Sequence, residues 1–142
     1  MNNVFFSVII PTFNRAEFLK KAIDSVYNQT FKNFELIVID SYSTDKTDQI
    51  IQGFENIIYK KINKKGNISA SRNLGIKSSK GKWIAFLDSD DIWSKNKLQF
   101  LFDIIKKNNS NVYCNSEWII NDNQKSKNKI WHYGPYRKNF YE

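Results

Sequence analysis

The chain has 142 residues, 41% of them hydrophobic, and a formal net charge of +8. This length suits one domain with one core and excludes two ordinary domains. Its single cysteine, Cys114, excludes an internal disulfide, and no apolar run approaches the roughly 20 residues that span a bilayer.

Two buried strands, each followed by a helix, are predicted in the first half of the chain. Residues 4–10 form an apolar, β-branched run that stops at a proline, as expected of a buried strand ending in a loop. Asn14 is expected to cap the next helix, whose apolar side chains recur on one face over residues 18–26. Residues 34–39 predict a second buried strand, and the Ser, Thr and Asp residues after it, among them Ser43, are typical helix caps.

The same order continues in the second half. Residues 57–62 are a weaker strand candidate, residues 67–81 read as a capped helix, and residues 83–87 predict a fourth strand. Ser94 is expected to cap a last helix with an apolar face over residues 98–105. Strands that alternate with helices predict an α/β fold, with a mostly parallel sheet covered by helices on both faces.

Polar residues follow three of the predicted strands. In open α/β sheets, ligands bind beyond the carboxyl ends of the strands, so these residues are expected to converge on one site. They are Pro11, Thr12, Phe13 and Asn14 after the first strand, Asp40 and Ser41 after the second, and Asp88, Ser89, Asp90 and Asp91 after the fourth.

The acidic group Asp88, Asp90 and Asp91 calls for a compensating positive charge. Carboxylates this close in sequence raise one another's pKa unless a cation or a fixed donor offsets them. Helix capping alone needs one short side chain rather than three carboxylates. Paired carboxylates at the end of an apolar strand ordinarily hold a hard divalent cation, which the sequence therefore predicts here.

Two segments carry a resemblance to a known family. They are "SVIIPTFNRAEFLKKAIDSVYNQTFKNFELIVIDSYSTDKT" and "GNISASRNLGIKSSKGKWIAFLDSDDIW". From about residue 7 to residue 98 the chain resembles the N-terminal, nucleotide-sugar-binding part of the family 2 inverting glycosyltransferases. The resemblance implies a Rossmann-like GT-A fold. It also implies that Asp88–Ser89–Asp90 is the D-x-D motif of the family, in which Asp90 would ligate Mn²⁺ or Mg²⁺ on the donor's diphosphate, and Asp88 would lie by the ribose or the metal.

Three further positions bear on recognition of the nucleotide base. By the resemblance, Phe13 lies where the family often places an aromatic ring against the base. Asp40 matches the first of two acids that are frequent in the family, but Ser41 stands at the second, which commonly accepts a hydrogen bond from the base. Either Asp40 takes over that role or the base is held differently.

Other substrate-binding residues follow from the same resemblance. Arg72 matches an Arg-Asn segment of the family, and its guanidinium could reach the donor's diphosphate. Pro11, Thr12 and Ser89 are expected to line the donor site, since they belong to the matched strand-end segments.

The implied reaction is metal-dependent transfer of a sugar, with inversion, from a nucleotide-diphosphate sugar to an acceptor hydroxyl. Such a reaction needs a general base. Of the acids after Asp103, which are Glu117, Asp122 and Glu142, none stands in a motif that matches the family. We therefore expect residues 1–142 to be a single donor-binding domain, truncated at its C-terminus, in which residues 99–142 begin the acceptor side.

The alternatives belong to other functional classes. A nucleotide-sugar-binding module without turnover would also fit, because Ser41 and the missing base both weaken catalysis. A nucleic-acid-binding domain would gather Lys and Arg with aromatic residues on one face, whereas here they are scattered, so no nucleic-acid partner is expected. A phosphohydrolase shares a D-x-D start, but it normally has Thr or Val soon after the second Asp.

The resemblance also implies the remaining partners. The acceptor would be a glycan or a lipid-linked glycan. We expect a cytoplasmic location, because the N-terminus shows neither a basic leader nor an apolar run of signal-peptide length. Peripheral association with the inner face of the membrane stays open as an alternative.

Overall fold

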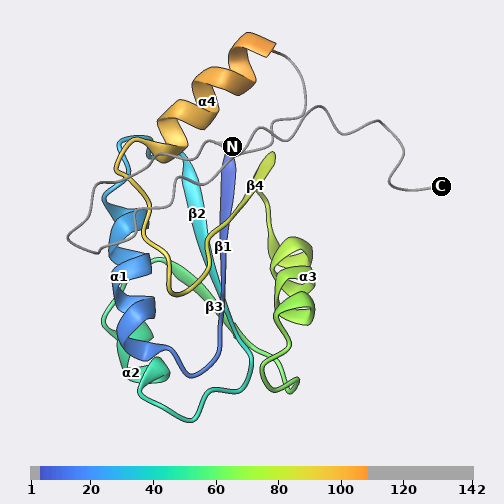
Figure 1. Ribbon diagram of the computed structural model, residues 1–142. Helices are drawn as coiled ribbons and strands as arrows, with labels where there is room; N and C mark the ends of the chain where they lie inside the picture. Colours follow the sequence, from blue (N-terminus) through green and yellow to red (C-terminus); the bar gives the residue numbers. More distant parts are fainter. Residues whose placement is uncertain (1–3, 109–142) are drawn as a thin grey trace, which may run out of the picture. The chain divides into compact units, whose positions relative to one another are not determined.

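The computed structural model describes residues 4–108 and shows parallel strands alternating with helices (Figure 1). Within these residues the sheet has four strands in the order β3-β2-β1-β4, and every neighbouring pair is parallel. The strands are β1 (Phe6–Thr12), β2 (Phe34–Asp40), β3 (Ile57–Lys61) and β4 (Trp83–Phe86). The helices are α1 (Ala16–Tyr27), α2 (Thr47–Gln52), α3 (Ile68–Ser78) and α4 (Lys97–Asn108). The predicted α/β class and element order are confirmed.

The chain divides into two units, with the boundary after Phe100 and therefore inside α4. The first unit holds the whole sheet, α1 to α3 and the strand-end loops. In the part of the chain that the structure describes, no helix has the length and apolar character needed to cross a membrane.

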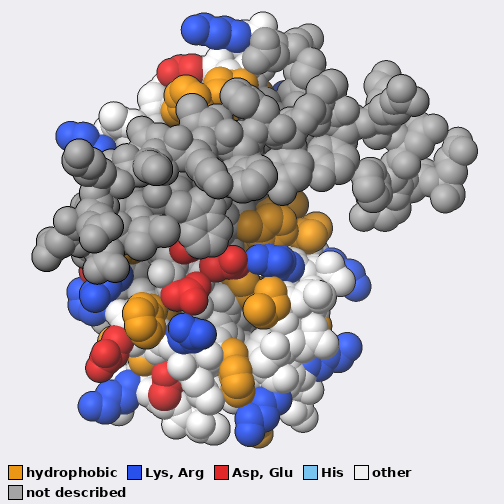
Figure 2. Space-filling view, viewed as in Figure 1, with side chains coloured by type: hydrophobic (Ala, Val, Ile, Leu, Met, Phe, Trp, Pro, Cys, Tyr) orange, Lys and Arg blue, Asp and Glu red, His pale blue; other side chains and the backbone are white. Residues whose placement is uncertain are grey.

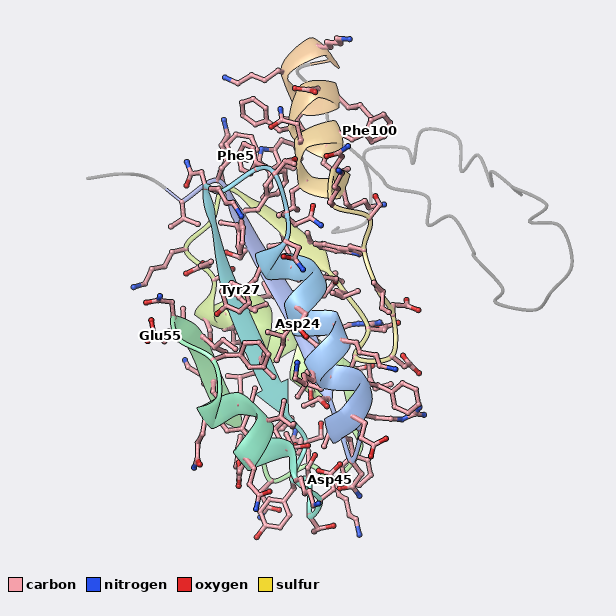
Figure 3. The ribbon with its side chains drawn as sticks, turned by 90° about the vertical axis from the view of Figure 1, so that its left-hand side faces the viewer. Phe5, Asp24, Tyr27, Asp45, Glu55 and Phe100 are labelled. Carbon is pink, nitrogen blue, oxygen red and sulfur yellow. The ribbon has the colours of Figure 1, made fainter. Side chains whose placement is uncertain are left out.

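The register of β1 against β2 decides which face of the sheet each side chain occupies. Thr12 is paired with Asp40 at the carboxyl end of the two strands. Since paired residues share a face and successive residues alternate, Asp40 lies on the face of Thr12, and Ser41 points to the opposite one. Helices α1 and α2 cover one face of the sheet, and α3 covers the other (Figure 1, Figure 3).

The core beneath α3 is a compact aliphatic cluster. Ile9, Ile37 and Ile39 are fully buried, and Leu74 of α3 packs against them. Gly75 lets the helix approach closely, because a Cβ atom there would lie 2.4 Å from Ile9 Cγ2. Any side chain at Gly75 would therefore push α3 away from β1.

On the other face, α1 buries the predicted apolar stripe. Leu19, Ala22, Ile23 and Val26 are fully buried, whereas Phe18, which was expected on the same stripe, is half exposed. Such a stripe at helical spacing provides most of the stability of a helix that covers a sheet.

The predicted cap at Asn14 is wrong. Asn14 adopts a left-handed conformation with φ of 51°, and the residue that precedes α1 is Arg15, which makes no side-chain capping bond. Instead the first N–H of the helix, that of Ala16, donates to Asp45 Oδ2 at 2.9 Å. The local sequence pattern resembles a capping box, but a carboxylate from the next loop provides the acceptor.

The close packing at Gly75 gives a test of the fold. Replacing an interior helical glycine with alanine usually stabilises a helix, by about 1 kcal/mol. Gly75→Ala should instead destabilise the protein by roughly 1–3 kcal/mol, because the new methyl group meets Ile9. Urea denaturation would measure the change, with Ser69→Ala on the exposed side of α3 as the control. A stabilising Gly75→Ala would contradict this packing.

Candidate functional site

A pocket of about 330 Å³ opens beyond the carboxyl ends of β1, β2 and β4. This volume falls at the lower end of the range typical of small-molecule sites. Its wall combines apolar residues with hydroxyl and charged groups from four loops. The lining residues are Pro11, Thr12, Phe13, Arg15, Ser41, Gly66, Ile68, Asp88, Ser89 and Asp90. Residues of all three strand-end segments line this pocket, as predicted, but Asn14, Asp40 and Asp91 of those segments do not.

Each carboxylate of the Asp88–Ser89–Asp90 segment has an arginine partner from a different element. Arg72 Nη2 of α3 lies 2.7 Å from Asp88 Oδ1, and Arg15 Nη1, just before α1, lies 3.3 Å from Asp90 Oδ2. In Figure 2, acidic and basic side chains lie next to each other near the middle of the face shown. Two guanidinium groups of the protein itself thus offset the charges of two of the three acids, Asp88 and Asp90.

Asp91, the third acid of the group, has a raised pKa. Partial burial is the main cause, and the negative charges of Asp88 and Asp90 add to it. The carboxylates of this loop therefore lie close enough for their negative charges to act on one another.

Arg15 is a site residue that the sequence analysis missed. Arg15 lines the pocket, and its guanidinium carbon lies 5.8 Å from the centre of the Phe18 ring. Arg72 is held in a similar way, 5.6 Å from the centre of the Phe86 ring. The available signal was its position, since Arg15 follows the first strand-end segment directly. Its partner Asp90 is far away in the sequence, so the pairing leaves no local sequence pattern.

Asp40 and Ser41 face different surroundings. The Asp40 side chain is fully buried, and it accepts hydrogen bonds from the Ser43 N–H and hydroxyl and from the Tyr59 hydroxyl. Burial, followed by hydrogen bonds to Asp48 and Asp40, raises the pKa of Tyr59, so it remains a neutral donor. Ser41 lines the pocket, and its hydroxyl lies 2.6 Å from that of Ser71. Recognition of a base by Asp40 stays a prediction, and in this structure its carboxylate organises the loop.

Phe13 and Gly66 form an apolar part of the wall. Gly66 has φ of 65°, which favours glycine, and a Cβ atom there would lie 3.3 Å from Phe13 Cδ1. The β3–α3 loop therefore packs closely against the Phe13 ring. Thr12 also lines the pocket, and its Oγ1 atom is buried without a hydrogen-bond partner among residues 4–108.

Hydrogen bonds join the loops after β1 and β2 into one unit. The Asn14 N–H donates to Ser43 Oγ at 2.8 Å, and the Thr44 N–H donates to Asn14 Oδ1 at 2.8 Å. Asp45 accepts from Ala16 through one oxygen and from Thr47 through the other. Figure 3 shows Asp45 beside the first turns of α1 and α2. These bonds fix the loop that carries Phe13 and Arg15 relative to the loop that carries Ser41.

The residues present fit a divalent cation that arrives with a ligand. Within residues 4–108 no group of three His, Cys, Asp or Glu side chains is arranged to hold a metal ion. The pocket does offer two carboxylates, from Asp88 and Asp90, on one wall. Mg²⁺ typically binds through one or two carboxylates and completes its shell with phosphate oxygens and water, and this sparse donor set suits that chemistry.

Similar proteins define the class. Residues 7–142 match the family described as Glycosyl transferase family 2. The Staphylococcus aureus protein TarP, a poly(ribitol-phosphate) beta-N-acetylglucosaminyltransferase, is 43% identical over 75% of this chain and 34% of its own length. Escherichia coli WfgD, a UDP-Glc:alpha-D-GlcNAc-diphosphoundecaprenol beta-1,3-glucosyltransferase, is 38% identical over 87% of this chain and 49% of its own.

Solved structures agree with the sequence comparison. The crystal structure of S. aureus TarS 1-349 in complex with UDP-GlcNAc has a TM-score of 0.71 and 31% identity, over 74% of this chain and 32% of that one. The arrangement of strands and helices is thus that of the GT-A glycosyltransferases. The chain belongs to glycosyl transferase family 2, and it spans between a third and a half of the length of these relatives.

Asp45 provides a test of the loop unit. Partial burial raises the pKa of Asp45, but hydrogen bonds from the Thr47 hydroxyl and from the Ala16 and Thr47 N–H groups outweigh it and hold the pKa below the ordinary 3.8. The ionised Asp45 carboxylate therefore stabilises the fold at pH values above 3.8, the ordinary pKa. This stabilisation is lost as the pH falls through the lower pKa of the folded state. Asp45→Ala should cost about 0.5–2 kcal/mol near pH 7, the range for a lost helix cap.

The pH dependence separates this role from a general charge effect. The stability difference between wild type and Asp45→Ala should shrink below about pH 4, as the wild-type carboxylate is protonated. Urea denaturation at several pH values would show it, with Asp24→Ala on the exposed side of α1 as the control. A difference that stays constant down to pH 2 would argue against the ionised acceptor.

Proposed function

We propose that this chain forms the donor-binding part of a glycosyltransferase. Such an enzyme transfers a sugar from a nucleotide-diphosphate sugar to an acceptor hydroxyl, with inversion at the anomeric carbon. The observation that carries the proposal is the pocket at the strand ends, which is lined by Asp88, Asp90, Arg15 and the apolar Phe13. Arg72 does not line this pocket, but it pairs with Asp88. Family membership supports the proposal, and TarS, crystallised with UDP-GlcNAc, makes UDP the first nucleotide to try.

Each part of the pocket has a task in this proposal. Phe13, Pro11 and Ile68 offer an apolar surface for the nucleotide, and Ser41 offers a hydroxyl that can donate or accept. Arg72 pairs with Asp88, so its guanidinium would be within reach of a diphosphate that a divalent cation holds beside that carboxylate. Planar guanidinium groups match phosphate oxygens in pairs, so Arg72 would orient the diphosphate as well as attract it.

Asp88 and Asp90 would hold Mn²⁺ or Mg²⁺. When bound, such an ion stabilises the negative charge that develops on the departing diphosphate. Both carboxylates come from the one loop that follows β4, so the residues of the other loops would be left to bind the donor. The absence of a general base from this chain stays a prediction, and Glu117, Asp122 and Glu142, the acids after Asp103, lie outside the described residues.

We propose an acceptor that is a glycan or a lipid-linked glycan. TarP is named for poly(ribitol-phosphate), and WfgD for a diphosphoundecaprenol-linked sugar, so both kinds of acceptor occur among the relatives. The cytoplasmic location and peripheral membrane association predicted from the sequence stay predictions, as does the assignment of residues 1–142 to a single domain.

Metal-dependent binding through Asp90 tests the proposal. Asp90→Asn keeps the shape of the side chain but removes its charge, so the affinity for UDP in Mn²⁺ should fall at least tenfold, or about 1.4 kcal/mol. Isothermal titration calorimetry with and without Mn²⁺ would measure it. Asp91→Asn is the matched control, because it removes the same charge from the same loop at a residue that does not line the pocket. Equal UDP binding by wild type and Asp90→Asn would refute the assignment.

Ser41 tests how the base is held. A carboxylate at this position can accept the ring N–H of uracil, whereas the corresponding nitrogen of cytosine carries no hydrogen. Ser41→Asp should therefore leave UDP binding unchanged or tighter, and it should disfavour CDP relative to UDP by about 1–3 kcal/mol, the cost of an unpaired buried group. Titration of both nucleotides into Ser41→Asp and Ser41→Ala would decide it. Loss of all nucleotide binding by a folded Ser41→Asp protein would show that the pocket is arranged differently.

A further inference from the structure

Two arginines and two aspartates form two ion pairs, whose charges cancel, at the end of the pocket that Asp88 and Asp90 line. Arg15 pairs with Asp90, and Arg72 with Asp88, so the four side chains sum to zero (+2 − 2 = 0). The two pairs differ in geometry, since the Arg72 pair closes at 2.7 Å and the Arg15 pair is looser at 3.3 Å. Arg15 is therefore the partner that exchanges more readily.

The exposure of the Arg15 pair also makes it easy to open. The side chains of Arg15 and Asp90 are 50% and 47% exposed. Ion pairs this exposed contribute so little that breaking one changes an equilibrium by about fivefold at most. A divalent cation that binds Asp90 can displace such a partner without a large loss of affinity.

A nucleotide-diphosphate sugar and a divalent cation would enter this site as a pair with no net charge on the diphosphate and the metal together. The diphosphate diester carries two negative charges and the cation two positive ones. If the cation takes the carboxylates and the arginines take the phosphate oxygens, every charge keeps an opposite partner before and after binding. This exchange avoids leaving a desolvated, unpaired charge at any stage.

We propose that Arg15 is a diphosphate-binding residue that neutralises Asp90 only while the pocket is empty. When metal and donor bind, the guanidinium leaves Asp90 for the diphosphate. Arg15 is placed for both positions, because it lies on the pocket wall before the first turn of α1, and the adjacent Phe18 ring supports the guanidinium. The proposal rests on the proposed function, since it requires a diphosphate ligand with a divalent cation.

The exchange predicts effects of opposite sign from one substitution. Arg15→Gln removes the competitor for Asp90, so Mn²⁺ alone should bind about two- to fivefold more tightly. The same substitution removes a phosphate contact, so UDP in the presence of Mg²⁺ should bind at least fivefold more weakly. A purely structural role for Arg15 would weaken both ligands together.

The experiment uses the full chain and needs no enzymatic turnover. Electron paramagnetic resonance of free Mn²⁺ would give the metal affinity, and calorimetry would give that of UDP and, for a ligand without a base, of inorganic pyrophosphate. Lys20→Gln is the matched control, because it removes one positive charge and one surface ion pair from α1 away from the pocket, and it should change neither affinity. Arg15→Lys keeps the charge and should retain wild-type Mn²⁺ affinity with part of the UDP affinity.

Any other combination of changes in Mn²⁺ and UDP affinity would refute the proposed exchange of Arg15 between Asp90 and the diphosphate. If Arg15→Gln changes neither affinity, or weakens both, Arg15 does not alternate between the two partners. Tighter Mn²⁺ with unchanged UDP and pyrophosphate would leave Arg15 as a neutralising residue without a diphosphate contact. Failure of the wild-type chain to bind either Mn²⁺ or UDP would reject the proposed function, and the exchange with it, whereas normal wild-type binding with a silent Arg15→Gln rejects the exchange alone.

Discussion

The parallel register of β1 and β2 is the constraint on which the site depends. Pairing of Thr12 with Asp40 ends both strands at the same level, and their loops then bond directly to each other. Alternation along β2 sends Asp40 toward α1 and α2 and Ser41 toward α3. The Asp40 carboxylate is therefore hydrogen-bonded within the loop, and Ser41 lines the pocket.

Electrostatics impose the second constraint. A chain with a net charge of +8 places its acidic loop where two arginines from separate elements can reach it. Both ion pairs are partly exposed, so they organise the loop without adding much to stability. Ion pairs of this kind position the loop in the empty site, and they are weak enough to be replaced by contacts with a charged ligand.

Sequence patterns predicted the elements well, because strands and helices follow from local periodicity, and the convergence of the strand-end segments follows from a parallel sheet. The cap at Asn14 was wrong because a distant carboxylate, Asp45, competes with a local motif. The pairing of Arg15 with Asp90 could not be predicted either, because it depends on how α1 and the β4 loop meet in space. The orientation of Asp40 could not be predicted because it depends on the register between β1 and β2, which cannot be read from either segment alone.

The reciprocal bonds between Asn14 and the loop of Ser43 and Thr44 have a consequence for protein engineering. The two loops depend on each other, because one backbone N–H group of each, that of Asn14 and that of Thr44, donates to a side chain of the other loop. A graft of the first loop into a related scaffold would therefore need the second loop as well. An insertion or deletion in one loop is expected to break the bonds that hold the other, so the two segments should be transferred together.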